Sequence, residues 1–202
     1  MNRMLTALIV VLSIGLEGFI LWACTGKCIY PNCAAPERAA ATRWLTEQAG
    51  GDGAKVKIDF ERFRCIDSTT LTDEISRRRE LQETKAAKEL SFRDDYRRRG
   101  LRTNAARKDS SIAHCRAVIA GLDSIAFARA AQADSVLFRE YEVIGTAATR
   151  YDVKRFDPIF LCIAPDGTVV SSSGNLPDIH KATGKAIPGY MELLDGLKAR
   201  GI

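Results

Sequence analysis

The chain has 202 residues, of which 46% are hydrophobic and 27% are charged, with 30 Lys and Arg against 25 Asp and Glu. This ordinary composition excludes a chain that is disordered throughout or collagen-like. The length fits one domain of average size with an extension and is too short for two full-sized domains.

The first feature along the chain is the apolar run from Leu5 to Ala23, which contains one charged residue, Glu17. Such a run is typical of an export signal or a membrane anchor. We therefore expect segment 1–23 to place the chain at the cell membrane, with the rest on the periplasmic or another extracytoplasmic side. The run is either retained as an anchor, cleaved before Cys24 or packed as a core helix. Cleavage is an option because Leu-Trp-Ala-Cys resembles the bacterial lipobox, whose cysteine is lipidated.

Residues 24–53 are predicted to form an irregular neck and a helix. Cys28 and Cys33 lie in the neck among Gly, Pro and Asn, and an oxidising compartment would permit a disulfide between them. The helix is expected from Pro36 to Gln48, because Pro is well accommodated in the first turn of a helix.

A strand and a helix are predicted next. Apolar and charged residues alternate over 54–64, which is typical of a strand with one solvated face. Thr70 precedes Asp73 at the spacing of a capping box, so a helix is expected to start there.

Positive charge is concentrated between residues 77 and 108, which hold 12 Lys and Arg against 5 Asp and Glu. The remaining residues hold 18 Lys and Arg against 20 Asp and Glu. This segment predicts a solvated helical hairpin that breaks near Gly100. An acidic protein or anionic lipid headgroups are the partners it could bind. Nucleic acid is not expected, because an exported protein rarely meets it and only Phe92 and Tyr96 could stack on bases.

The remaining chain alternates between helix and strand signals. A second helix is expected from Ser110 or Ser111, with an apolar stripe at Ile112, Cys115, Ile119, Leu122 and Ala126. Strands are expected at 135–144, 159–164 and 168–172, a short helix or turn at 146–153, a hairpin turn at Asp166-Gly167, a loop at Gly174 and Pro177, and a last helix opened by Pro188.

The region from Ser135 to Ile202 resembles the second half of the thioredoxin fold. The resemblance lies in Tyr151, Val153, Pro158, Ile159–Ile163, Pro165-Asp166-Gly167, Val169, Val170 and Gly174. It implies an α/β domain over 54–202, with a thioredoxin-like mixed sheet flanked by helices and a charged helical insertion at about 77–132. It also implies that Pro158 follows a cis peptide bond, faces a reactive cysteine and helps to bind a peptide backbone.

No Cys-x-x-Cys pair occurs in the chain, and the nearest motif is Cys65-Ile66-Asp67-Ser68. It looks like the monothiol form of the family motif, in which Cys65 would attack a protein disulfide and Ser68 could not resolve the mixed disulfide. A purely structural role for Cys65 is the alternative. A rival placement puts the active site at the N-terminal cysteines, where Cys24 and Cys28 form a Cys-x3-Cys and Cys28 and Cys33 form a Cys-x4-Cys.

The other candidate ligands and nucleophiles are few. Cys162 falls inside an apolar strand, and Cys115 falls on the apolar stripe of a helix beside His114, so both are predicted to be packing residues. No metal and no cofactor are expected, because His114 and His180 are the only histidines and lie far from the clustered cysteines.

Two functions follow from these patterns. The first is a membrane-tethered thiol-disulfide oxidoreductase that uses Cys65, Ser68 and Pro158 on a protein thiol or peptide. The second is a redox-inactive thioredoxin-like binding or assembly module whose basic insertion meets an acidic protein partner.

Overall fold

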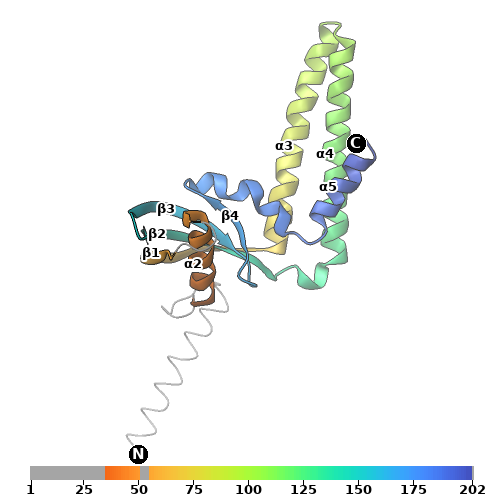
Figure 1. Cartoon of the computed structure of the whole chain (residues 1–202). Coiled ribbons are helices and arrows are strands. Elements are labelled where there is room, and N and C mark those ends of the chain that lie inside the picture. Colours follow the sequence, from red (N-terminus) through yellow and green to blue (C-terminus); the bar gives the residue numbers. More distant parts are fainter. Residues whose placement is uncertain (1–34, 51–54, 202) are drawn as a thin grey trace, which may run out of the picture. The chain divides into compact units, whose positions relative to one another are not determined.

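The computed structural model describes residues 35–50 and 55–201 (Figure 1). The predicted anchor 1–23, the lipidation candidate Cys24 and the neck pair Cys28 and Cys33 lie outside the described residues. The elements are, in chain order, α2 (Ala35–Gly50), β1 (Lys57–Thr70), α3 (Leu71–Arg98), α4 (Arg102–Ala128), the 3₁₀ turn η1 (Ala130–Gln132), β2 (Val136–Ala148), β3 (Val153–Ile163), β4 (Val169–Ser173), the 3₁₀ segment η2 (Leu176–Ala186) and α5 (Tyr190–Ala199).

The described residues divide into two compact units. Unit 1 contains the described residues up to Ser68 together with Phe138–Ile179, and unit 2 contains Thr69–Leu137 together with the residues from His180 onward. Helices and strands both occur, which confirms the α/β class.

The sheet has the strand order β1-β2-β3-β4 among the described residues, and β2 pairs antiparallel with β3, which pairs antiparallel with β4. The expected mixed sheet is therefore wrong, since the four strands form an antiparallel sheet. The short connections between β2, β3 and β4 explain this result, because a parallel pair needs a crossover of a dozen or more residues.

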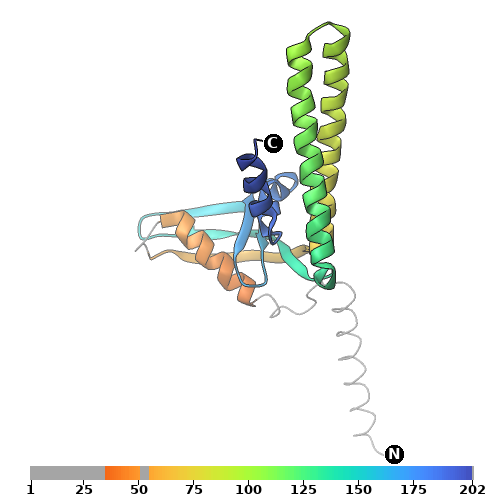
Figure 2. The same cartoon turned by 90° about the vertical axis from the view of Figure 1, so that its right-hand side faces the viewer.

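Helix α2 covers one face of the sheet in unit 1 (Figure 2). Alternate residues of β2 and β3 point toward it, which is the period of two expected for a half-buried sheet. Their buried cluster consists of Ala40, Ala41, Leu45, Tyr141, Val143, Leu161 and Ile163. The predicted helix at 36–48 is confirmed with one more residue at its start and two at its end.

Two predicted elements in unit 1 are wrong, and one predicted turn is confirmed. β1 starts at Lys57 and runs to Thr70, so the predicted strand at 54–64 is too early and too short. The short helix or turn expected at 146–153 is instead the end of β2, a tight turn and the start of β3. Asp166-Gly167 makes the predicted turn between β3 and β4, where Gly167 has a φ of 82°.

Unit 2 contains the predicted helical hairpin, formed by α3 and α4 (Figure 1). The Thr70 side chain and the Asp73 side chain cap the start of α3 reciprocally, which confirms the predicted capping box. The hairpin turns at Gly100, whose φ of 74° is the left-handed conformation that glycine adopts most easily. Helix α4 then starts at Arg102, eight residues before the predicted Ser110, because no breaker separates the charged segment from the apolar stripe.

Apolar packing is concentrated at the base of the hairpin, where α5 lies against α4 (Figure 2). The buried cluster there consists of Leu71, Ile75, Val118, Leu122, Ile187, Tyr190 and Leu197. In the predicted apolar stripe of α4, Val118 is buried in place of Ile119. Two later predictions need correction: the loop at Pro177 is part of η2, and α5 begins at Tyr190 after the N-cap Gly189 rather than at Pro188.

Candidate functional site

The predicted nucleophile Cys65 lies inside β1, on the face that α2 covers. Its side chain is half-buried, and its thiol donates a hydrogen bond of 3.4 Å to the carbonyl oxygen of Asp67. Helix α3 begins at Leu71, so the motif ends before the helix and Cys65 is not at a helix N-terminus. The helix dipole therefore cannot stabilise a thiolate in the way that the predicted monothiol site requires.

Burial raises the pKa of the Cys65 thiol above its ordinary value of 9.0, and the nearby Arg139 guanidinium offsets only part of that rise. The same surroundings raise the pKa of the Tyr141 hydroxyl, first through burial and then through Cys65 and Glu37. Arg139 Nη1 donates to Glu37 Oε1 over 2.8 Å. Because burial outweighs the effect of Arg139, the raised pKa favours the protonated thiol, which is a weaker nucleophile than a thiolate.

The second motif residue, Ser68, also belongs to β1, and its backbone N–H donates to the Asp67 carboxylate over 2.8 Å. Pro158 lies inside β3 rather than before it. The expected cis bond is wrong, since the described residues contain no cis peptide bond. Asp157 and Pro158 together face the single residue Ile144 of β2, and a bulge of this kind accepts proline because it needs no ladder N–H.

The structure therefore does not bring the three predicted catalytic residues together. Cys65 and Ser68 lie on β1 and Pro158 on β3, with β2 between them. Neighbouring strands are about 4.8 Å apart, so two strand spacings place Pro158 roughly 10 Å from the line of β1.

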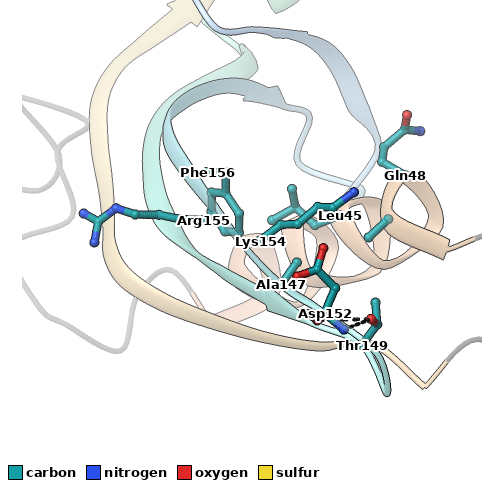
Figure 3. Close-up of a pocket in the computed structure, with 9 residues that line it drawn as sticks. Leu45, Gln48, Ala147, Thr149, Asp152, Lys154, Arg155 and Phe156 are labelled. Carbon is teal, nitrogen blue, oxygen red and sulfur yellow. Dashed lines mark hydrogen bonds between the residues drawn. The ribbon is translucent and has the colours of Figure 1, made fainter.

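A pocket of about 400 Å³ opens beside the end of α2 in unit 1 (Figure 3). Its floor is apolar, with Leu45, Ala147 and Phe156 among its lining residues. The Thr149 hydroxyl donates to the Asp152 carbonyl over 3.1 Å and accepts from the Asp152 N–H over 3.0 Å. This hydroxyl is thus committed to the β2–β3 turn, and the described residues that line the pocket offer no paired nucleophile and base for catalysis.

Arg155 also lines the pocket but points away from the other lining side chains in Figure 3. Its guanidinium pairs with Glu61 over 3.0 Å and with Asp157 over 3.6 Å. Among the described lining residues, Lys154 is therefore the cation that remains beside the apolar floor. The pocket is an apolar hollow lined by one ammonium group, that of Lys154, and by the Asp152 carboxylate, which suits binding of a small ligand.

The most strongly charged surface of unit 2 is the tip of the hairpin, residues 93–109, which we call the hairpin tip. It holds seven Lys and Arg against three Asp, a net of +4. Arg97 and Arg98 end α3 and Arg99 is its C-cap, and their side chains are 55%, 78% and 67% exposed. Arg102 and Arg107 on α4 are exposed as well and make no ion pair with the described residues.

Ion pairs hold the two helices together near this tip. Asp109 on α4 accepts from Arg97 over 2.9 Å and from Arg93 over 3.4 Å, both on α3. Lys108 on α4 pairs with Glu89 on α3 over 2.7 Å. The first turn of α4 has neither an acidic residue nor a capping side chain, so the positive end of its dipole adds to the arginines. This arrangement can attract and bind anionic groups.

At the base of the hairpin lies a buried polar network that the sequence pattern did not reveal. Glu74 is fully buried and accepts from Arg78 Nε over 2.7 Å and from the Thr183 hydroxyl over 2.8 Å. Arg77 Nη1 donates to the other Glu74 oxygen over 2.6 Å and lies 3.0 Å from His180 Nδ1. The network ties η2 to α3, and its groups satisfy one another, so we assign it a structural role.

The two other described cysteines lie in the core. Cys162 and Cys115 are fully buried, as expected for packing residues. Within the described ranges, no three His, Cys, Asp or Glu side chains are grouped closely enough to hold a metal ion. In length and composition, α4 could cross a bilayer, but core helices often meet the same criterion, and α4 packs along α3.

Comparison with protein families, with curated proteins and with solved structures finds no match to this chain. The relationship to thioredoxin-like proteins stays a prediction from the sequence. Compared with the surroundings of Cys65 and the pocket beside α2, the hairpin tip carries more charge, and its arginine side chains are more than half exposed.

Proposed function

We propose that this chain is a membrane-tethered binding module that engages an acidic protein partner through the hairpin tip. The observation that carries the proposal is the run Arg97-Arg98-Arg99 at the end of α3, more than half exposed at each position, beside Arg102 on α4. Arginine is suited to this task because its planar guanidinium binds carboxylates in a bidentate manner.

The chemistry of the tip favours a protein partner. The arginine forks bind carboxylates and phosphates alike in a bidentate manner, so the preference for a protein rests on the apolar surface beside them. Phe92 lies nearby with 43% of its surface exposed, between Lys88 and Lys108, whose ammonium groups are 5.9 Å and 5.3 Å from its ring centre. An exposed aromatic ring flanked by cations suits a mixed apolar and acidic peptide surface.

The tether and the compartment in this proposal rest on the sequence. The apolar run at 5–23 supplies the tether, and an oxidising extracytoplasmic side is the compartment that its export implies. A thioredoxin-like scaffold is part of the same proposal. We favour binding over thiol-disulfide exchange because the Cys65 pKa is raised and because Pro158 and Cys65 lie two strands apart.

The test uses the full chain in a nonionic detergent and immobilised poly-L-glutamate as the probe. The double variant Arg98→Glu/Arg102→Glu reverses two exposed charges, and we expect it to lower the affinity about ten-fold or more. The wild-type affinity should fall steeply as the ionic strength rises, because exposed charges are screened by salt.

A matched control keeps the net charge change and moves it elsewhere. Arg43→Glu/Lys198→Glu reverses two exposed charges on α2 and α5 and should bind poly-L-glutamate as the wild type does. Equal losses in both double variants would show a dependence on net charge alone and contradict the proposal. A competition experiment separates protein from lipid as the partner. If short-chain phosphatidylserine displaces the chain from the immobilised probe at a lower concentration of negative charge than soluble poly-L-glutamate does, the tip binds lipid instead.

A further inference from the structure

Strand β1 is an edge strand among the described residues, because β2 is its neighbour on one side and the strand order ends there. An edge strand leaves backbone N–H and C=O groups unpaired along its outer side, where another chain can add a strand. β1 has 14 residues, against a usual strand length of about 5 to 6 residues. It therefore offers an unusually long pairing edge.

The two faces of β1 differ sharply in chemistry. Ile58, Phe60, Phe63 and Cys65 pack toward α2, and the intervening residues are mostly charged. The alternation is interrupted once, because Glu61 and Arg62 are both exposed between two inward phenylalanines. This is the mark of a β-bulge, in which one extra residue shifts the alternation. The bulge therefore divides β1 into two halves whose inward positions have opposite parity.

Glu142 of β2 anchors the charged side chains of the second half. It pairs with Arg64 over 2.9 Å and with Arg62 over 3.4 Å. Glu142 is mostly buried, whereas the two arginine side chains are 65% and 55% exposed. Both arginines are thus held on the face of β1 that points away from α2, and each has exposed surface that a further carboxylate can contact.

We propose that two copies of the chain pair antiparallel through β1, with Glu61 of each copy opposite Arg62 of the other. In this register Phe60 lies opposite Phe63, and Asp59 lies opposite Arg64. Ile58 then faces Cys65 on the α2 side. Over residues 58–65, each inward residue meets an inward residue and each acidic residue meets an arginine, which is the pattern that stabilises adjacent strands.

Because of the bulge, this register lets both halves of β1 pair with the other copy at the same time. A two-fold axis normal to the sheet keeps every side chain on its own face, so opposite residues must share a face. Shifting the pairing by one or two residues sets an inward phenylalanine against an outward charge at the bulge. Pairing within one half alone is less favourable: centred on Phe60 it sets Asp59 opposite Glu61, and centred on Phe63 it sets Arg62 opposite Arg64, so like charges repel. Centred on Ile58, it joins only Lys57 to Asp59 within β1 and leaves the rest of the strand unpaired.

The experiment measures the dimer affinity of the full chain in a nonionic detergent by sedimentation equilibrium. The dimer contains the contact between Asp59 and Arg64 twice. Asp59→Arg turns both contacts into pairs of arginines, and Arg64→Asp turns both into pairs of aspartates. Each variant alone should dimerise about ten-fold more weakly than the wild type or worse. An equimolar mixture of the two variants should form a heterodimer with the affinity of the wild type. One of its two contacts joins the two introduced charges, and the other joins the original Asp59 and Arg64. The charges in each contact are therefore opposite in sign.

The mixture separates the proposal from trivial explanations. A misfolded variant would not recover in the mixture, and a dimer made by the apolar N-terminal run would respond to neither substitution. Glu47→Arg is the control, since it makes the same charge change at an exposed position on α2 and should leave the affinity unchanged. A monomeric wild type, or a mixture as weak as its components, overturns the proposal. Arg98→Glu/Arg102→Glu should dimerise normally, so the edge and the hairpin tip are tested independently.

Discussion

At the residue scale, burial decides what a charged side chain does in this protein. Glu74 and Glu83 both lie on α3, four residues from an arginine that they contact, at 2.7 Å for Arg78 and 2.9 Å for Arg79. The Glu74 side chain is fully buried, whereas the Glu83 side chain is 55% exposed. The first pair is part of a network across unit 2, and the second is screened by water.

This contrast predicts very different costs for the same substitution. Glu74→Ala leaves Arg78 buried without a counter-charge and should lower the free energy of unfolding by about 3 to 5 kcal/mol. Glu83→Ala should lower it by no more than about 0.5 kcal/mol. Urea unfolding of both variants checks this expectation. Similar costs in the two variants would mean that the buried network does not hold η2 to α3.

At the element scale, the start of α3 is fixed by local hydrogen bonds. The Thr70 hydroxyl accepts from the Asp73 backbone N–H over 3.2 Å, and the Thr70 N–H donates to Asp73 Oδ2 over 3.0 Å. Hydrogen bonds from the Thr70 hydroxyl and backbone hold the pKa of the Asp73 carboxyl below its ordinary value of 3.8. Its lowered pKa stabilises the folded state above pH 3.8, and this contribution is lost as the pH falls through the folded value.

Removing the cap should therefore change both stability and its pH dependence. We expect Thr70→Ala to lower the free energy of unfolding by about 1 kcal/mol at neutral pH. The difference between wild type and variant should shrink below the ordinary pKa of Asp73, because protonated Asp73 no longer accepts these hydrogen bonds strongly. Thermal unfolding across the acidic range measures this. A difference that stays constant with pH would refute the role given to Asp73.

At the scale of the whole molecule, the positive charge is separated from the rest of the chain. Residues 77–108 carry a net of +7 and all others a net of −2. The buried residues of α3 end at Arg78, so the basic part of this helix lies beyond the apolar base. Such a distribution attracts anionic groups to one end of the hairpin at low ionic strength.

The same distribution predicts that the hairpin can be shortened without loss of the buried cluster at its base, although the deletion removes the buried residues Ala105 and Ile112. Replacing residues 87–113 by a short Gly-Ser linker keeps the base cluster, which includes Ile75, Val118 and Leu122. The free energy of unfolding should change by no more than about 1 kcal/mol, and binding to poly-L-glutamate should be lost. Urea unfolding and the binding assay together check this. Unfolding of the shortened chain would show that the distal hairpin is part of the core.

Some features could be predicted from the sequence because they depend on neighbours along the chain. The capping box at Thr70, the break at Gly100 and the turn at Asp166-Gly167 each need only a few consecutive residues, and the structure contains all three. The basic character of the hairpin tip is likewise visible in the sequence. Local hydrogen bonds, backbone conformation and composition are properties that the order of residues determines by itself.

Tertiary structure decided the features that join distant residues. Thr183 meets Glu74 from 109 positions away, so no local pattern could mark this glutamate as buried. Pro158 was expected before a strand, but its place depends on how β3 pairs with β2, where a bulge removes the need for its missing N–H. The surroundings of Cys65 also depend on tertiary structure, because burial under α2 raises the pKa of its thiol. Strand pairing and burial arise only when the elements pack, and they decided which charges are buried and which remain available for partners.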